Sequence, residues 1–191
     1  MNYRYAMTLL AAASMSIGLG VSGITDANAA NLKLDAAKSS LEFSFSQLGV
    51  PMKGKFTKFS ANVFFDAKKP EATKADFTVD LNSVSLGAAD YDAETKSPLW
   101  LNARAFPNAT FVAERVASVG PGRFEATGKL SIKGATQPIK ATFTYTDGAN
   151  PVVEGSFPMK RLAWKIGDGE WKDTSIVADD VTVRFRFVTS K

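Results

Sequence analysis

Carboxylates are the side chains of this sequence best placed to do acid–base chemistry. The sequence contains no His and no Cys, which excludes a histidine base, a thiol nucleophile, an imidazole or thiolate metal site and a disulfide. Asp168, Glu170 and Asp173 lie together in a glycine-containing stretch, and two carboxyl groups suffice for glycoside hydrolysis. With Trp171, the stretch 167–173 is typical of a solvated loop, and a loop over the mouth of a binding site is the alternative.

Other motifs of enzymes and metal sites are missing or incomplete. No Ser precedes a Lys by three residues, and there is neither a Gly-x-Ser-x-Gly turn nor a phosphate loop ending in Gly-Lys-Ser or Gly-Lys-Thr. Asp90, Asp92 and Glu94 imitate the first half of a calcium loop, but Thr95 and Leu101 stand where Gly and Glu are required. We therefore predict no catalytic residue, no metal ligand and no enzymatic activity.

The charge pattern disfavours a nucleic-acid partner. The chain has 191 residues, with 23 Lys and Arg against 19 Asp and Glu, a net charge of +4 that is spread along the whole length. A dedicated nucleic-acid binder would gather its basic residues into one surface. Length and composition indicate a single globular domain.

The N-terminal segment has the features of a secretory signal peptide. Arg4 precedes an uncharged run over residues 6–25, and Ala27 and Ala29 supply the small residues that a signal peptidase requires. We expect residues 1–29 to be cleaved and residues 30–191 to form one exported domain, with the periplasm favoured over the external medium.

The rest of the chain alternates apolar and polar residues, the pattern of strands with one buried face. The inward sets begin at Leu41, Phe77, Phe124, Ile139 and Val181. A longer alternating run over residues 52–65 changes phase between Phe56 and Phe59, which indicates a bend near Thr57. We count about eight strands.

One segment departs from this alternation. Residues 88–102 are rich in Ala, Asp, Glu and Lys, which favours a short helix limited by Pro98. One short helical insert among about eight strands predicts an all-β fold, a closed antiparallel barrel, because closure removes exposed strand edges. An immunoglobulin-like sandwich is the alternative.

The apolar faces are the candidate binding site. The sequence has 14 Phe but only four Tyr and three Trp, and a barrel of eight strands either fills its interior or holds one small ligand. An open interior would accept only an apolar guest, and it would not suit a sugar. Trp100 and Trp164 pair an apolar body with an N–H donor and suit the mouth of a pocket. The candidate ligand-binding residues are Phe43, Phe45, Phe56, Phe77, Val79, Trp100, Phe111, Leu130, Phe143, Phe157, Trp164, Phe185 and Phe187.

Five short motifs in order resemble the YceI-like family of exported, lipocalin-like barrels associated with polyisoprenoid and other long-chain lipids. They begin at Asp35, Met52, Trp100, Gly128 and Val177, and the stretch from Gly128 to Ile139 is the most specific. The resemblance implies a barrel with an apolar tunnel, and it makes a homodimer conceivable. Members of the family often carry His beside the opening Ser and near the end of the first strand. This chain has Lys38 or Ser39 and then Gln47 there, so a head-group contact through His is not expected.

Two functions remain open. The first is a carrier or storage protein for a long apolar lipid, such as a polyisoprenoid, an isoprenoid quinone or a fatty-acyl chain, with no other cofactor. Lys53, Lys55 and Lys58 would then draw the protein into transient contact with a membrane or form a solvated strand face. The second is a non-enzymatic interaction module with a packed core that binds a partner through its loops.

Overall fold

The computed structural model describes residues 29–191. The predicted signal peptide of residues 1–29 lies, apart from Ala29, outside these described residues. Among residues 29–191, no helix is both long enough and apolar enough to cross a membrane.

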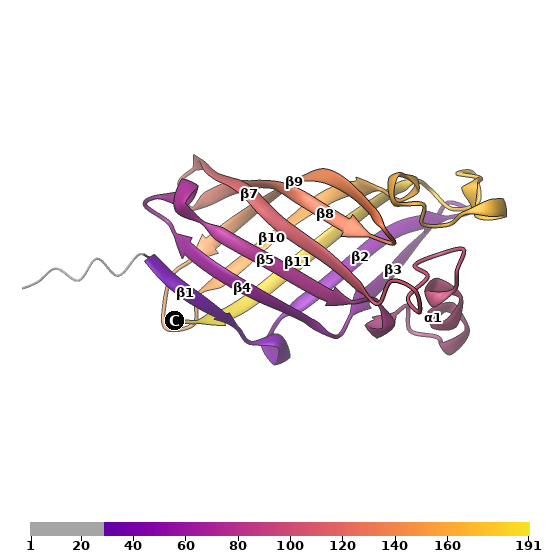
Figure 1. Cartoon of the computed structure of the whole chain (residues 1–191), viewed down its shortest axis with the longest axis horizontal. Helices are drawn as coiled ribbons and strands as arrows, with labels where there is room; N and C mark the ends of the chain where they lie inside the picture. Colours follow the sequence, from indigo (N-terminus) through magenta and orange to yellow (C-terminus); the bar gives the residue numbers. More distant parts are fainter. Residues whose placement is uncertain (1–28) are drawn as a thin grey trace, which may run out of the picture.

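The described chain consists almost entirely of strands, with one α-helix (Figure 1). The strands are β1 (Ala29–Leu34), β2 (Ser40–Gln47), β3 (Val50–Phe56), β4 (Phe59–Asp66), β5 (Lys74–Asp80), β6 (Val84–Ser85), β7 (Asn108–Gly120), β8 (Arg123–Ile132), β9 (Ala135–Thr146), β10 (Val152–Lys160) and β11 (Asp180–Ser190). The helix α1 covers Ala89–Lys96, and short 3-10 helices cover Ala36–Lys38, Pro70–Ala72, Leu81–Ser83, Arg161–Trp164 and Gly169–Lys172.

The strands form a closed antiparallel barrel of eight strands, as the sequence predicts, and this excludes the sandwich. The order is β1-β4-β5-β7-β8-β9-β10-β11, and β1 closes the circle by pairing with β11. The remaining three strands each continue one of these passes. β2 pairs with the same edge of β11 as β1 does, and so continues β1. β3 pairs with β2 and leads into β4, and β6 follows β5 in the chain and pairs with β3. Eleven strand segments among the described residues therefore make eight passes around the barrel.

The bend predicted near Thr57 is confirmed. β3 ends at Phe56 and β4 begins at Phe59, and the chain between them is held by hydrogen bonds from the backbone N–H groups of Thr57 and Lys58 to the Ser83 hydroxyl oxygen. Because of the bend, β3 pairs with β2 and β6 at one end of the barrel, and β4 pairs with β1 and β5 at the other.

Four connections lie at the same end of the barrel as α1, which is on the right of Figure 1. They are the β2–β3 turn, the segment 97–107 after α1, the β8–β9 turn and the segment 161–179 between β10 and β11. Asp90 and Asp92 in the first turn of α1 and Lys96 in the last complement the helix dipole. The Leu86 backbone N–H donates to Asp92 Oδ1 at 2.5 Å, which fixes the start of the helix.

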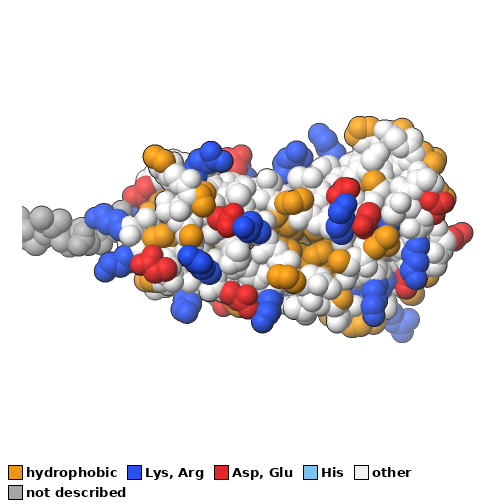
Figure 2. All heavy atoms as spheres, turned by 90° about the horizontal axis from the view of Figure 1, so that it is seen from above, with side chains coloured by type: hydrophobic (Ala, Val, Ile, Leu, Met, Phe, Trp, Pro, Cys, Tyr) orange, Lys and Arg blue, Asp and Glu red, His pale blue; other side chains and the backbone are white. Residues whose placement is uncertain are grey.

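The buried side chains form two clusters, one toward each end of the barrel. The cluster at the α1 end includes Leu81, Leu101 and Trp164, and the cluster at the opposite end includes Phe65 and Phe124. On the face shown in Figure 2, Lys and Arg side chains are interspersed with Asp and Glu, and smaller groups of hydrophobic side chains lie between them. The core is therefore divided, and the space between the two clusters is the interior of the barrel.

Candidate functional site

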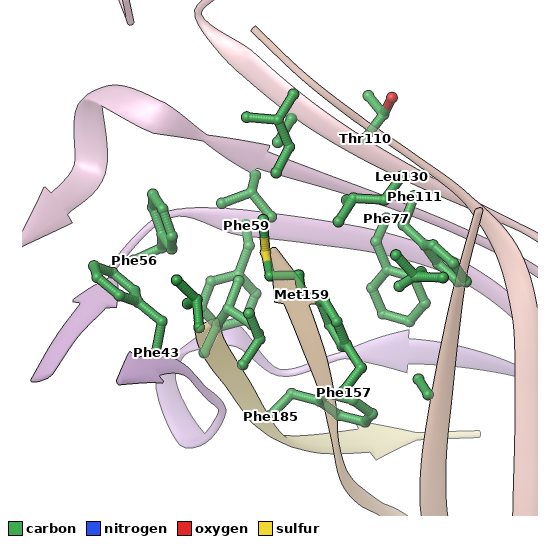
Figure 3. A pocket seen from close by; sticks show the side chains of 18 of the residues that line it. Phe43, Phe56, Phe59, Phe77, Thr110, Phe111, Leu130, Phe157, Met159 and Phe185 are labelled. Atoms are coloured by element: carbon green, nitrogen blue, oxygen red, sulfur yellow. The ribbon is translucent and has the colours of Figure 1, made fainter. Parts of the chain in front are cut away.

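An apolar cavity of about 320 Å³ follows the barrel axis. Side chains from all eight passes of the barrel line it, and most of them are Phe, Leu, Val, Ala or Ile. Figure 3 shows Phe43 and Phe56 side by side, Phe77 and Phe111 on the other side, and Met159 between them. Many of these rings are only half-buried although they point inward. An inward ring that stays partly exposed marks open space, because a packed core would cover it.

Twelve of the thirteen predicted ligand-binding residues line this cavity, and their contact with a ligand stays a prediction. They are Phe43, Phe45, Phe56, Phe77, Val79, Trp100, Phe111, Leu130, Phe143, Phe157, Phe185 and Phe187. The placement of Trp164 at the mouth is wrong: its side chain is only 3% exposed, and its indole N–H donates to the Leu130 carbonyl oxygen at 3.0 Å. The 3-10 helix of residues 161–164 turns this indole into the core, beside the cavity wall.

Three inward-facing glycines let aromatic rings lie flat against the barrel wall. Gly54 pairs with Phe43, and a Cβ built on Gly54 would lie 2.8 Å from Cε1 of that ring. A Cβ on Gly155 would lie 2.8 Å from Phe185 Cζ, and one on Gly128 would lie 2.7 Å from Phe111 Cε2. Glycine within a strand costs stability and often marks a close approach. Here the approach keeps the rings out of the barrel axis and holds the cavity open.

Aromatic packing closes the cavity at the end away from α1. Phe65 is buried and meets Phe124 edge-on, with 5.2 Å between ring centroids, and it lies 4.6 Å from the ring of Tyr145. Burial, with Asp147 beside it, raises the pKa of Tyr145 to about 12. Thr73 lines this end as well, and its buried hydroxyl has no hydrogen-bond partner among the described residues.

The cavity reaches solvent at the α1 end. Tyr91 and Glu94 of α1 line it and are themselves exposed, Tyr91 by 50%. Gln47, at the end of β2, lines the same region, and its backbone forms an isolated antiparallel β-bridge with Val177. The polar lining side chains are thus concentrated at this end, which gives the cavity a polar mouth and an apolar depth.

Arg161 holds the segment 161–179 at the mouth, and sequence analysis missed it. Its side chain lines the cavity yet is only 2% exposed. It donates hydrogen bonds to five backbone carbonyl oxygens, those of Ile166, Gly167, Trp171, Val177 and Ala178, at 2.6–3.2 Å. Burial lowers its pKa and nearby Asp179 opposes that shift, and a guanidinium stays charged at neutral pH in either case.

Two indoles complete the mouth beside this arginine. Trp100 lies under the guanidinium, with 5.5 Å from Arg161 Cζ to the ring centroid, and its ring is 5.4 Å from that of Trp171. The Trp100 indole N–H is buried and has no acceptor among the described residues. Lys133 Nζ donates to the carbonyl oxygens of Leu99 and Lys165 and so joins the segment 97–107 to the segment 161–179.

Two of the three carboxylates in the 167–173 stretch, those of Asp168 and Asp173, accept hydrogen bonds within the loop itself, and Glu170 is exposed. Asp168 Oδ1 accepts from the Gly169 backbone N–H at 2.9 Å and from Lys172 Nζ at 2.7 Å. Asp173 Oδ1 accepts from the backbone N–H and hydroxyl of Ser175. The Lys172 hydrogen bond lowers the pKa of Asp168, and the Ser175 hydroxyl lowers that of Asp173. A general acid needs a raised pKa, so this geometry suits turn formation. Residues 29–191 also contain no group of three or more acidic side chains able to hold a metal ion.

Comparison with known proteins places this barrel in a family. The family model of the YceI-like domain matches residues 32–189, which is nearly all of the described chain. The chain belongs to the YceI-like family. A UPF0312 protein of Shewanella denitrificans is 36% identical over 137 residues, which cover 70% of this chain and 69% of the relative.

Two solved structures show how far the structural similarity extends. The crystal structure of Burkholderia cenocepacia BcnA has a TM-score of 0.79 and 40% identity, and it covers 81% of this chain and 98% of BcnA. A structure from Saccharophagus degradans, described as a polyisoprenoid binding domain implicated in plant cell wall breakdown, has a TM-score of 0.65 at 17% identity, covering 84% of this chain and 98% of that one. The second likeness concerns the fold alone.

Proposed function

We propose that this protein binds one long apolar lipid chain inside its barrel. The observation that carries the proposal is the cavity of about 320 Å³, with a hydrocarbon wall, a closed apolar end and a polar mouth. Such a cavity holds its guest by desolvation, worth about 25 cal/mol per Å² of apolar surface removed from water. The polyisoprenoid-binding description of the Saccharophagus degradans neighbour supports this ligand class.

The cavity suits a single-chain lipid whose head group stays at the mouth. A polyisoprenoid, an isoprenoid quinone and a fatty-acyl chain all fit this description, and a sugar would find no hydrogen-bonding partners along the Phe-lined wall. Gln47, Tyr91, Glu94 and Thr95 line the mouth and are the polar side chains near such a head group. The family match, together with the hydrogen bonds that Asp168 and Asp173 accept within their own loop, supports a binding protein over an enzyme.

We propose further that the protein carries or stores this lipid in the periplasm. The basic start, uncharged run and small residues of the N-terminal segment support export. A long hydrocarbon chain crosses an aqueous compartment only when it is shielded, and an internal cavity provides that shielding.

The first test is native mass spectrometry of the protein purified from its own exported compartment, followed by organic extraction. We expect one lipid per chain. Delipidated protein should then take up an added polyprenol or quinone. Ala61→Phe places a ring in the cavity and should weaken uptake about tenfold or more, because Ala61 lines the space.

Val112→Phe is the matched control, since it adds a ring at an exposed position on β7. Equal uptake by wild type, Ala61→Phe and Val112→Phe would contradict binding in the cavity. A protein that is empty on purification and refuses every added lipid would make the packed interaction module the better account.

A further inference from the structure

The tip of the β2–β3 hairpin, residues 48–51, is an exposed apolar surface that the lipid cavity does not explain. Leu48 is 70% exposed and Val50 is 58% exposed, and Gly49 and Pro51 beside them are exposed as well. Large apolar side chains on a turn gain nothing from folding when they stay in water. Their presence suggests a surface that is covered during function.

The backbone of the tip makes Leu48 an unusual choice. Leu48 and Gly49 form the two-residue turn between Gln47 and Val50, with φ of +48° and +79°. A turn with two positive φ angles favours Asn or Asp followed by Gly, whereas Leu is strained there. The equivalent β8–β9 turn at the same end carries Lys133 before Gly134. The Leu48 side chain therefore lowers the stability of the fold through the positive φ of its backbone, and its exposure to water brings no compensating gain from burial.

The tip adjoins the mouth of the cavity. Gln47, next to Leu48, lines the cavity and bridges to Val177, which also lines it. The Leu48 backbone N–H donates to the Ile176 carbonyl oxygen at 2.8 Å, so the tip is anchored to the segment 161–179. Figure 1 shows this hairpin, the segment 161–179 and α1 together at one end of the barrel. The exposed apolar tip and the entrance for the ligand are parts of one surface.

Other exposed apolar side chains share this end. Tyr91 on α1 and Leu99 and Phe106 in the segment 97–107 are 50%, 40% and 37% exposed. Charges of both signs lie around them: α1 carries Asp90 and Glu94 but also Lys96, and Asp168 is paired with Lys172. The mouth therefore offers apolar contact without a strong field of either sign.

We infer that the hairpin tip inserts into a phospholipid bilayer and brings the cavity mouth against the membrane, so that the lipid passes between bilayer and barrel without entering water. A bilayer is the partner because the proposed cargo resides in one; the choice of partner thus rests on the proposed function. Exposing a hydrocarbon chain to water costs about 0.8 kcal/mol per CH₂ group, and direct contact at the mouth avoids that cost. Lys53 and Lys55 lie on β3 beyond the tip, and Lys58 lies in the bend that follows β3, so insertion depends on apolar contact.

The test measures flotation with phosphatidylcholine vesicles. The double variant Leu48→Asn/Val50→Thr keeps the turn, because Asn accepts positive φ and Thr favours strands. We expect the wild type to float with the vesicles and the double variant to partition about tenfold less strongly. Val112→Thr, which replaces a methyl group of an exposed apolar side chain on β7 with a hydroxyl group, is the matched control and should float like the wild type.

A second measurement separates this inference from the proposed function. A polyprenol added from an ethanol stock should bind the double variant as it binds the wild type, whereas uptake from polyprenol-loaded vesicles should be about tenfold slower. If the wild type binds no lipid from either source, the proposed function fails, and flotation alone decides on membrane insertion. Equal flotation of wild type and double variant would overturn the inference. So would binding that requires phosphatidylglycerol and disappears at high salt, because that result indicates electrostatic attraction.

Discussion

Gly54 shows at the scale of one residue how the barrel keeps its interior open. The atoms nearest to a Cβ at this position all belong to the far edge of the Phe43 ring, so Gly54→Ala would push that ring toward the barrel axis without touching backbone. We expect the variant to fold, with stability changed by about 1 kcal/mol or less, and to bind lipid more weakly. Isothermal titration with a solubilised polyprenol measures the change.

The double variant Gly54→Ala/Phe43→Leu tests the same contact from the other side. A Leu side chain occupies less of the space near position 54, so binding should return toward that of the single variant Phe43→Leu. If the double variant loses as much lipid binding as Gly54→Ala does, then the position of the Phe43 ring does not determine how much space the cavity offers the lipid.

At the scale of elements, Arg161 acts as the core of the segment 161–179. Its five hydrogen bonds to carbonyl oxygens replace the regular pairing that this segment lacks. Arg161→Met leaves these carbonyls without donors and should destabilise the segment by about 3–5 kcal/mol. Arg161→Lys should rescue only part of this, because an ammonium has three donors and no planar fork. Hydrogen exchange should show faster exchange at Ile166, Gly167 and Val177, whose backbone N–H groups bond within or near the segment.

The pairing of β1 with β4, far from the mouth, provides the internal control for this hydrogen-exchange prediction. β1 pairs with β4 through residues 29–33, and its protection should be unchanged in Arg161→Met as long as the barrel remains folded. Uniform loss of protection over both regions would mean that Arg161 supports the whole barrel and does not act on the mouth segment alone.

Sequence alone could predict the strands, the bend at Thr57 and most of the cavity wall, because each follows from local alternation. It could not predict the role of Arg161, because a charged residue after a strand is usually solvated and only the return of residues 166–178 buries it. Trp164 was misplaced for a similar reason: the alternation ends at Lys160, and nothing in the pattern indicates that a 3-10 helix follows. Gly54 and Gly155 stood at inward positions, but their use required the cross-strand partners to be known.

At the scale of the whole molecule, the cavity separates two buried clusters that a bound chain would connect. The cluster with Phe65 and Val116 closes one end, and the cluster with Leu101 and Ile166 lies beside the mouth. A ligand that binds only the folded state stabilises it by about 2.7 kcal/mol at a concentration of 100 times Kd. For a chain of this size that corresponds to an increase in Tm of about 5–10 °C.

The closed end of the barrel should make this stabilisation depend on chain length. In a series of single-chain fatty acids, each added CH₂ group buries more hydrocarbon and should raise affinity, with an upper limit of about 0.8 kcal/mol per group, until the chain reaches Leu32 and Phe65 at the closed end. Beyond that length, the Tm measured by calorimetry at fixed ligand concentration should stop rising. In Ala61→Phe the plateau should come at a shorter chain, because the new ring blocks the path. A Tm that is the same for all chain lengths, or a plateau that Ala61→Phe does not move, would show that the chain lies outside the barrel.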